Sequence, residues 1–385
     1  MTELRVVDVA EEHLDSVWRV RIRSFGPGGD REEWMKTARA FIEDRRIIGV
    51  VDGDELVAAA RIWPFEQWWN GRRVPLGGVA GVVVSPEYRG RGVGSLMMRA
   101  VLQRCVEKGY PLTALYPATT VLYRHLGYEF GGGQYKFSFQ AADLRTLGGR
   151  GTAVRRAGVA DADLLLALAA ASNEARRTSG PLIWPRSEIV SWLEDEDNFA
   201  YVAEDGFVVY RWSDGDLVVD ELIAGSEQTA RALWATVGSG SSIANTVQAY
   251  CGPSDPIHLL AEHEAQGDAR IVRWMLRLVD APAAFAARGY PAGAVLDVGL
   301  RIDDSELPAN TGDWRLSIAD GSARLTPAEP SDDAVRLGAR GLAALYAGTP
   351  VATLRNSGLV TGGAGLDAAL DAVFGGQAPY MLDYF

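Results

Sequence analysis

The sequence predicts an α/β protein of three domains, the last with an α+β arrangement, and three observations support this fold class. Strand and helix patterns alternate through the first part of the chain, a similar pattern restarts after residues 147–151, and the composition changes at Ala281. A chain of 385 residues also exceeds the usual size of a single hydrophobic core. We therefore expect domains at residues 1–147, 148–280 and 281–385.

The first domain is predicted to begin with a strand at residues 3–9 and a helix at residues 10–25, where apolar side chains recur at helical intervals. Asp30 is expected to cap a second helix, and Gly109 to end a later one. The remaining strands are expected at residues 46–53, 56–69, 72–86, 112–117 and 133–140, and the remaining helices at residues 31–42, 94–109 and 119–126.

The second and third domains are predicted in the same way. Residues 153–177 repeat the short strand and acidic helix start of residues 3–25, so the second domain is interpreted as a second copy of the first unit. Its strands are expected at residues 198–212 and 216–224, and its helix at residues 226–237; the third domain is expected to have strands at 294–302 and 313–328, a strand and helix within 334–348, and a last helix at 365–375. The terminal "APYMLDYF" is apolar and is predicted to be buried.

The composition is that of a soluble globular protein, with 48% hydrophobic and 23% charged residues. The net charge of −12 argues against nucleic-acid binding. Two cysteines exclude a disulfide framework and a cysteine-rich zinc site, and no metal site is expected. The sequence has neither a signal-peptide pattern nor an apolar run of about 20 residues that could span a membrane. A cytoplasmic protein is expected, with secretion by a route without a signal peptide left open.

The segment "VVVSPEYRGRGVGSLMMRA", residues 82–100, places arginines and glycines between a strand and a helix. Backbone N–H groups at a helix start have no intrahelical partner, and the helix dipole adds partial positive charge there. Glycines allow a phosphate to approach these groups closely, so the segment predicts a pyrophosphate site. Its spacing is R-x-x-G-x-G, which differs from both the P-loop and the dinucleotide-binding fingerprint. The second copy has no such segment, so only the first is expected to bind the anion.

This segment resembles the acyl-CoA-binding core of the GNAT acetyltransferases, and "LYRHLGYEF" resembles the segment that follows their thiol site. The whole chain is similar to the Eis (enhanced intracellular survival) branch of that family. The resemblance implies tandem GNAT folds, each a mixed central β-sheet flanked by helices, of which the second is degenerate. It also implies a C-terminal sterol carrier protein-like α+β domain, whose last residue reaches back to the first domain.

The resemblance implies a set of residues that bind acetyl-CoA, the co-substrate. Backbone groups of the strand end are implied to hold the pantetheine arm, the loop to hold the pyrophosphate, and a helix start to make a further contact. In this sequence those residues are Val82, Val83 and Val84 for the strand; Arg89, Gly90, Arg91, Gly92, Val93, Gly94 and Ser95 for the loop; and Ala118 and Thr119 for the helix start.

The resemblance also implies the groups that carry out the chemistry. Tyr123 matches the general acid that protonates the departing sulfur, and a phenol with a pKa of about 10 stays protonated at neutral pH. Tyr116 and Tyr128 are rivals on residue type alone. The C-terminal carboxylate of Phe385 matches the general base. For Tyr123 and for the terminal segment, the alternative is a purely structural packing role.

The implied substrate is a primary amine of the aminoglycoside, polyamine or lysine type. Phe25, Trp34, Asp383 and Tyr384 match positions at the amine site, but two acids that relatives place there are replaced by "GPGG" after Phe25 and by Tyr384. Acids within residues 30–33 could compensate or could simply be helix-start charges. Alternatives are a dedicated protein-lysine acetyltransferase and a non-catalytic acyl-CoA- or lipid-binding protein. A homo-oligomer, a hexamer by resemblance, is also expected.

Overall fold

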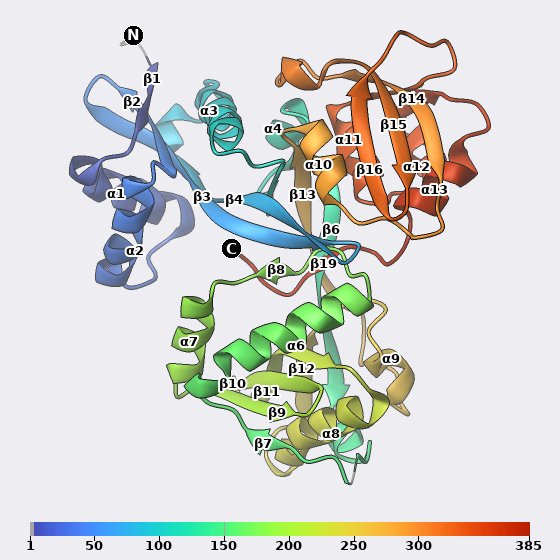
Figure 1. Cartoon of the computed structure of the whole chain (residues 1–385). Coiled ribbons are helices and arrows are strands. Elements are labelled where there is room, and N and C mark those ends of the chain that lie inside the picture. The colour runs from blue at the N-terminus through green and yellow to red at the C-terminus, as the bar shows by residue number, and fades with distance from the viewer. Residues whose placement is uncertain (1–3, 150) are drawn as a thin grey trace.

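The computed structural model describes residues 4–149 and 151–385. Residue 3 of the predicted first strand and residue 150 of the predicted boundary lie outside the described residues. Within these ranges the strands form two sheets, one of 14 strands and one of 5 strands, with helices packed on their faces (Figure 1). No helix in the two described ranges combines the length and apolar character needed to cross a bilayer.

The first part of the chain confirms the predicted alternation of strands and helices. Asp30 caps the second helix through its Oδ1 atom, which accepts hydrogen bonds from the N–H groups of Glu32 and Glu33 at 2.7 and 3.1 Å. Gly109 has a φ of +71° directly after the third helix, as its predicted stop role requires. The elements are β1 (Leu4–Asp8), α1 (Leu14–Phe25), α2 (Arg31–Glu43), β2 (Ile47–Asp52), β3 (Glu55–Trp69), β4 (Arg72–Val84), α3 (Val93–Glu107), β5 (Leu112–Leu115), α4 (Thr120–His125), β6 (Glu129–Gln140) and α5 (Ala141–Arg145).

The second part repeats this order of elements. Ser226 directly follows the β11 strand region and caps the next helix, so the strand-to-helix connection of this copy contains no arginine–glycine loop. The elements are β7 (Arg155–Arg156), α6 (Ala162–Ala175), β8 (Leu182–Ile183), α7 (Arg186–Glu194), β9 (Asn198–Ala203), β10 (Gly206–Ser213), β11 (Asp216–Ala224), α8 (Glu227–Gly238), β12 (Thr246–Tyr250), α9 (Ile257–Leu260) and β13 (Arg270–Leu278). The prediction did not include β8, α7, β12, α9 or β13, and it gave residues 198–212 as one strand where the structure has two, β9 and β10.

The third part forms the smaller sheet, in the order β16-β15-β14-β17-β18, with helices on one side. Its elements are α10 (Ala281–Ala287), β14 (Leu296–Asp303), β15 (Gly312–Ala319), β16 (Ser322–Pro327), β17 (Val335–Gly338), α11 (Ala339–Tyr346), α12 (Val351–Asn356), β18 (Val360–Gly362) and α13 (Asp367–Phe374), and the short β19 (Tyr380–Met381) follows. The α+β prediction for this part is confirmed.

The large sheet runs through the first two parts without interruption. Its order is β1-β2-β3-β4-β5-β13-β6-β12-β11-β10-β9-β7. The last strand of the second part, β13, lies between β5 and β6 of the first part, and the far half of β6 pairs with β12. Hydrogen-bonded strands from both sides of the predicted boundary therefore interleave, and the division at residues 147 and 148 stays a prediction.

Ion pairs, one of them fully buried, connect the third part to the other two. Arg277 of β13 is 0% exposed and donates to Asp304 at 2.6 Å and to the carbonyl of Leu126 at 2.9 Å. Glu129 of β6 pairs with Arg340 of α11. Loss of Arg277 would leave the buried Asp304 charge without a cation, so this pair in particular fixes the third part against the sheet.

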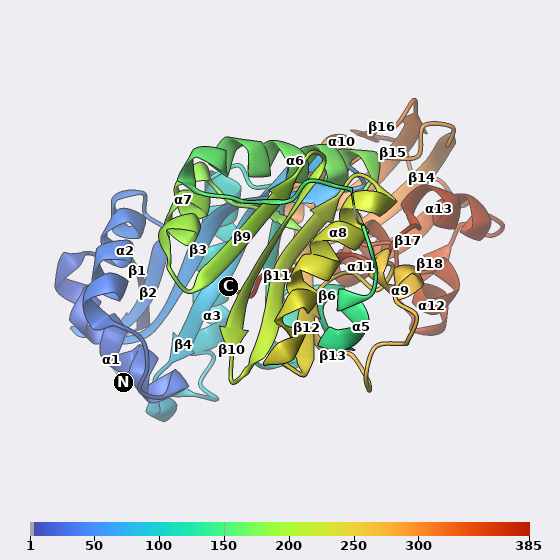
Figure 2. The same cartoon turned by 90° about the horizontal axis from the view of Figure 1, so that it is seen from below.

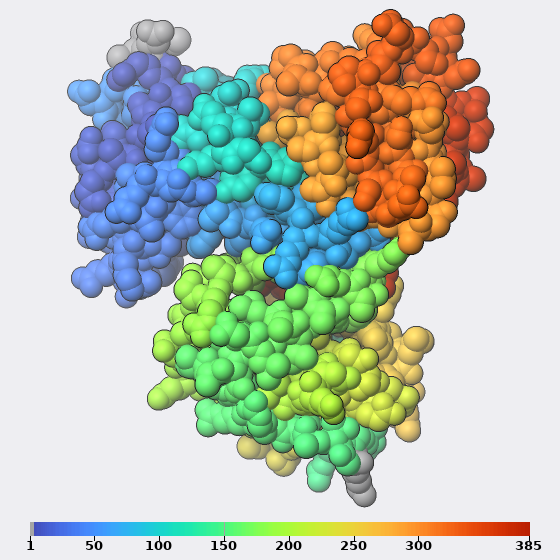
Figure 3. Space-filling model, viewed as in Figure 1, coloured from blue at the N-terminus to red at the C-terminus, as the bar shows by residue number. Residues whose placement is uncertain are grey.

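The C-terminal segment lies between the first and second parts (Figures 1 and 2). β19 pairs in parallel with β6, and the Tyr380 N–H donates to the Ser179 carbonyl at 3.0 Å. Dark red atoms of this segment are visible in the recess between the two parts (Figure 3). Predicted burial is confirmed for Tyr380 and Met381, but it is wrong for Tyr384, whose surface is 67% exposed.

Candidate active site

The arginine–glycine loop forms an uncapped helix start. Gly92 occupies the N-cap position of α3 with a φ of +81°, and no side chain caps the helix. Gly90 has a φ of +73°, and a Cβ atom added at either glycine would meet no atom within 4 Å. The first N–H groups of α3 therefore face open space, which is the geometry that an anion with several oxygens requires.

Both arginines of the loop are held near this helix start. The Arg89 Nε atom donates to the Val84 carbonyl at 3.2 Å, and the Arg91 guanidinium lies 5.5 Å from the centre of the Tyr88 ring. Tyr88 in turn donates to Asp52 at 3.0 Å. A guanidinium has five N–H donors, so these contacts orient each arginine while leaving donors for a ligand.

β4 and β5 separate directly beside this loop. They pair in parallel only over residues 76–78 and 112–114, and β5 ends at Leu115. β4 continues to Val84, paired with β3 on its other edge. Within the described ranges, the β5-facing edge of residues 82–84 has no strand partner. An extended ligand with amide groups can pair with such an edge as an added strand would.

Tyr123 of α4 is 4% exposed, and its ring lies 5.9 Å from that of Tyr128 at an edge-to-face angle. Burial raises the pKa of Tyr123 to about 12, so the phenol remains a proton donor at neutral pH. Its hydroxyl has no hydrogen-bond partner among the described residues. Ala118 and Thr119 are exposed at the start of α4, beside the end of β5.

The two rival tyrosines are engaged elsewhere. Tyr116 donates to the Asp383 carbonyl at 2.7 Å and so holds the C-terminal segment. The hydroxyl of Tyr128 lies 3.5 Å from Thr113 Oγ1 in the core. Burial raises the pKa of both phenols, but only Tyr123 combines a protonated hydroxyl with an unused hydrogen-bonding position among the described residues.

The chain end lies where β4 and β5 separate. The Phe385 ring packs 5.1 Å from Phe65 and 5.7 Å from Tyr116. A Cβ atom added at Gly78, the last β4 residue that pairs with β5, would lie 3.0 Å from Phe385 Cε2. The Gln134 amide donates to the Leu382 carbonyl at 2.8 Å and fixes the preceding residues.

The predicted amine-site aromatics lie in two different environments. Phe25 is 59% exposed at the end of α1, whereas Trp34 packs 5.3 Å from Trp18 between α1 and α2. Within the described ranges, the Phe385 ring packs against the aromatic rings of Phe65 and Tyr116 and against neither Phe25 nor Trp34. Asp30 is occupied as a helix cap and Glu33 pairs with Lys36, so these acids serve α2.

Sequence reasoning missed an aromatic cluster of which one member, Phe65, packs against the terminal Phe385 ring. Trp63 and Phe65 stack at 5.7 Å, and Trp184 packs edge-on against Phe65 at 5.0 Å. Trp63 and Phe65 alternate along β3, so their shared face was a signal available in the sequence. Trp184 comes from the second part, and only the tertiary structure brings it here.

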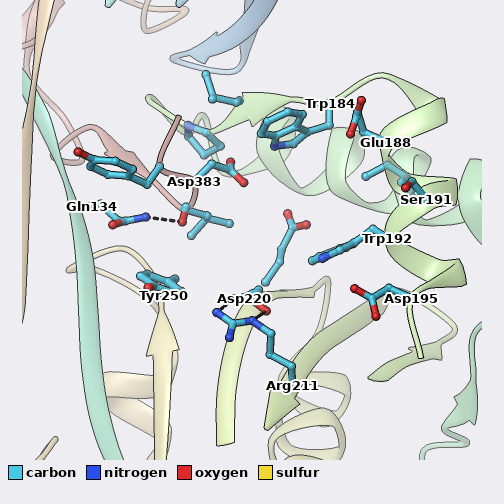
Figure 4. Close-up of a pocket in the computed structure, with 16 residues that line it drawn as sticks. Gln134, Trp184, Glu188, Ser191, Trp192, Asp195, Arg211, Asp220, Tyr250 and Asp383 are labelled. Carbon is cyan, nitrogen blue, oxygen red and sulfur yellow. Dashed lines mark hydrogen bonds and ion pairs between the residues drawn. The ribbon is translucent and has the colours of Figure 1, made fainter. Parts of the chain in front are cut away.

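A cavity of about 500 Å³ lies between the C-terminal segment, α7 and strands β10 to β12 (Figure 4). Its lining includes Gln134, Trp184, Glu188, Trp192, Asp195, Arg211, Asp220, Glu221, Tyr250, Leu382, Asp383 and Tyr384. Burial, with the nearby charge of Asp220, raises the pKa of Asp383 to about 6, against the opposing effect of the Trp184 indole. Asp383 and Tyr384 are thus the predicted substrate residues that reach a cavity.

Three segments of the chain match known domain families. Residues 5–131 match an acetyltransferase (GNAT) domain, residues 180–278 match a second family of the same description, and residues 281–382 match a sterol carrier protein domain. A crystal structure of a GCN5-related N-acetyltransferase from Kribbella flavida is 65% identical, with a TM-score of 0.98, and the match covers 100% of this chain and 98% of that one.

Two further relatives extend the likeness. An uncharacterized N-acetyltransferase of Streptomyces avermitilis is 28% identical over 357 residues, 85% of each chain. Eis1 from Mycobacterium abscessus is 24% identical, with a TM-score of 0.78 over 100% of both chains, and shares the fold.

The fold and the site define an acetyltransferase. The chain belongs to the GCN5-related N-acetyltransferase (GNAT) family. The predicted resemblance to its Eis-like members is confirmed by the three matched segments and by the fold shared with Eis1. The predicted fold class, two GNAT folds followed by a sterol carrier protein-like domain, is confirmed as well.

Proposed function

We propose that the protein transfers the acetyl group of acetyl-CoA to a primary amine of the aminoglycoside, polyamine or lysine type. In this proposal residues 1–147 hold the donor, residues 148–280 form a copy without a pyrophosphate loop, and residues 281–385 supply the C-terminal carboxylate. The observation that carries the proposal is the gap between β4 and β5 beside the uncapped start of α3. It offers an unpaired strand edge for the pantetheine amides and backbone N–H groups for the pyrophosphate.

The donor is proposed to bind in extended form along this gap. Residues 82–84 pair with the pantetheine arm, residues 89–95 surround the pyrophosphate, and Ala118 and Thr119 contact it from the start of α4. The positive φ of Gly90 and Gly92 and the open space around both glycines support close approach of a phosphate.

The reaction is proposed to be direct attack. The neutral amine forms a bond with the thioester carbonyl carbon, the carbon–sulfur bond breaks, and the sulfur leaves with the bonding electron pair. The Phe385 carboxylate takes the proton that the amine loses, and Tyr123 gives its phenolic proton to the sulfur. The protonated state of Tyr123 at neutral pH and its unengaged hydroxyl among the described residues support its role as the acid, and the contact of the Phe385 ring with the end of the β4–β5 pairing supports the position of the base.

The acceptor amine is proposed to approach from the cavity side. Asp383 and Tyr384 line the cavity and precede the proposed base. Phe25, exposed at the end of α1, and Trp34 of α2 are proposed to border the amine on the first-domain side. Of these positions, only Asp383 contributes a negative charge.

An extension of the chain by Gly-Ser after Phe385 tests this proposal. The extension moves the carboxylate away while the folded chain stays intact, so turnover should fall at least 100-fold while coenzyme A binding, measured by calorimetry, stays within twofold. The same dipeptide added before Met1 is the control. Turnover is measured as coenzyme A release with aminoglycosides, polyamines and lysine peptides, which also identifies a dedicated protein-lysine acetyltransferase. Full activity of the extended chain would remove the carboxylate from the mechanism.

The predicted homo-oligomer, a hexamer by resemblance, and the cytoplasmic location remain part of this proposal. Light scattering of the purified chain measures the molar mass and therefore the oligomeric state. A mass that corresponds to a monomer would contradict it.

A further inference from the structure

The second GNAT copy has its own separation between parallel strands, and this separation opens on the cavity. β11 and β12 pair in parallel only over residues 217–219 and 247–249, as β4 and β5 pair over residues 76–78 and 112–114. In the first copy apolar residues follow the paired segment of β4. In the second copy the next two residues are Asp220 and Glu221, and both line the cavity.

A β-bulge explains how two consecutive carboxylates reach one cavity. On the β10 side of β11, Val209 is opposite Glu221 and Tyr210 is opposite Val219, so Asp220 is the extra residue. Successive side chains of a regular strand point to opposite faces, whereas a bulge turns one of them. The local backbone thus directs both acids toward the C-terminal segment.

Glu221 lacks the partner that its neighbour has. Asp220 pairs with Arg211 at 3.0 Å, as Figure 4 shows, whereas Glu221 has no hydrogen bond or ion pair among the described residues. The Glu221 side chain is half-buried at the cavity wall, and burial, followed by the charge of Asp383, raises its pKa to about 8. A half-buried carboxyl without a cation is a group that a cationic ligand would stabilise.

The rest of the cavity suits a cation. Trp184, Trp192 and Tyr250 line it, and aromatic faces attract ammonium groups. Glu188 and Asp195 add carboxylates from α7 and its end. Among the described residues that line the cavity, Arg211 is the one cation and is paired with Asp220; Lys136, outside the lining, lies 5.3 Å from the centre of the Tyr250 ring.

We infer that Glu221, assisted by Asp383, binds a second cationic group of the acceptor, distal to the amine that is acetylated. The inference rests on the proposed function and names the acceptor class as amines with at least two positive charges. Relatives have acidic residues after the position of Phe25 and at the position of Tyr384, and this chain does not. In this inference, Glu221 in the second copy provides the negative charge instead, at a strand separation that has no donor loop.

Matched amine pairs test the inference with the full chain. Kinetics are measured for α,ω-diamines of three to eight carbons and for n-alkylamines of the same lengths, with wild type, Glu221→Gln and the control Glu194→Gln. Glu194 is an exposed acid at the end of α7 outside the cavity lining. We expect Glu221→Gln to raise KM for diamines about tenfold with little change in kcat and no change for n-alkylamines, while Glu194→Gln changes neither.

A second measurement separates the two proposals. Calorimetric binding of 1,5-diaminopentane to wild type and Glu221→Gln needs no turnover, and circular dichroism verifies that the variant is folded. If both proteins acetylate amines and show the same preference for diamines over n-alkylamines, the role of Glu221 is overturned and the proposed function stands. Binding that depends on Glu221 without acetylation of any amine would overturn the proposed function and leave the cation site. Binding and kinetics that are both independent of Glu221 would overturn the inference.

Discussion

The Glu221→Gln substitution has a consequence for stability that depends on pH. Burial raises the pKa of Glu221 from 4.5 to about 8, so the folded chain keeps a proton that the unfolded chain releases above pH 4.5. The stability that this protonated group contributes is complete below pH 4.5 and is lost as the pH rises through 8. Glutamine resembles the protonated form at every pH, so the free energy of unfolding of the variant should rise relative to that of wild type as the pH increases over this range.

The size of the effect follows from the shift. One pKa unit corresponds to about 1.4 kcal/mol, so the full shift sets an upper limit of about 5 kcal/mol for the difference between variant and wild type above pH 8. Half of that limit would raise the melting temperature by about 5–10 °C for a cooperative unit of about 200 residues. Below pH 5 the two proteins should melt together.

Thermal melts from pH 4.5 to 9 measure this difference. The groups that face Glu221 also titrate or carry charge, namely Asp383, the Asp220–Arg211 pair and the two carboxylates contributed by α7 and its end. Loss of the Glu221 charge also relieves Asp383, which adds to the gain of the variant at high pH. Glu194→Gln, an exposed acid replaced in the same way, should show no such trend. A difference between Glu221→Gln and wild type that stays constant with pH would refute the assignment of a half-buried carboxyl that is protonated in the folded chain.

Three further predictions concern the donor site and the domain junction. Tyr123→Phe should lower kcat by about 10²-fold or more with unchanged coenzyme A affinity, because it removes the proton donor alone; an unchanged rate assigns Tyr123 a packing role. Gly92→Val should abolish coenzyme A binding in calorimetry, because a β-branched residue is strained at a φ of +81° and fills the anion space; retained affinity contradicts the loop assignment. Arg277→Met should lower stability by about 3–5 kcal/mol in denaturant melts, because Asp304 is left buried and unpaired, and Asp304→Asn in the same chain should recover part of that loss.

Local patterns in the sequence were sufficient for most elements but not for their pairing. The capping of α2 by Asp30 and the end of α3 at Gly109 depend on residues within a few positions, and both were predicted. The place of β13 between β5 and β6 depends on contacts between residues far apart in the chain, which periodicity does not encode. The same limit applies to Trp184, which reaches Phe65 only after the second part packs on the first.

The arginine–glycine loop could be located in the sequence because strand, loop and helix are consecutive. Arg89 and Gly92 are three positions apart, so a short motif includes both, while their role in donor binding stays a prediction. The cavity is assembled from β11, α7 and the C-terminal segment, and the acids that line it carry no motif. Nothing in the sequence distinguishes Glu221 from other strand residues. Its environment is set by the bulge at Asp220 and by the nearby Asp383, which are known only from the tertiary structure.

The C-terminal segment connects the two strand separations of the large sheet. β19 pairs with β6, a strand that also pairs with β12 and β13 of the second part. After β19, Phe385 contacts the position of Gly78 at the end of the β4–β5 pairing, and Asp383 lines the same cavity as Asp220 and Glu221. A second copy that kept its donor loop would need its strand separation for a coenzyme. Without the loop, the same separation is available for acidic side chains. Because Phe385 and Asp383 are two residues apart, the segment that would present the proposed base to the donor also borders the proposed cation site, and the two proposed sites would share one segment of the chain.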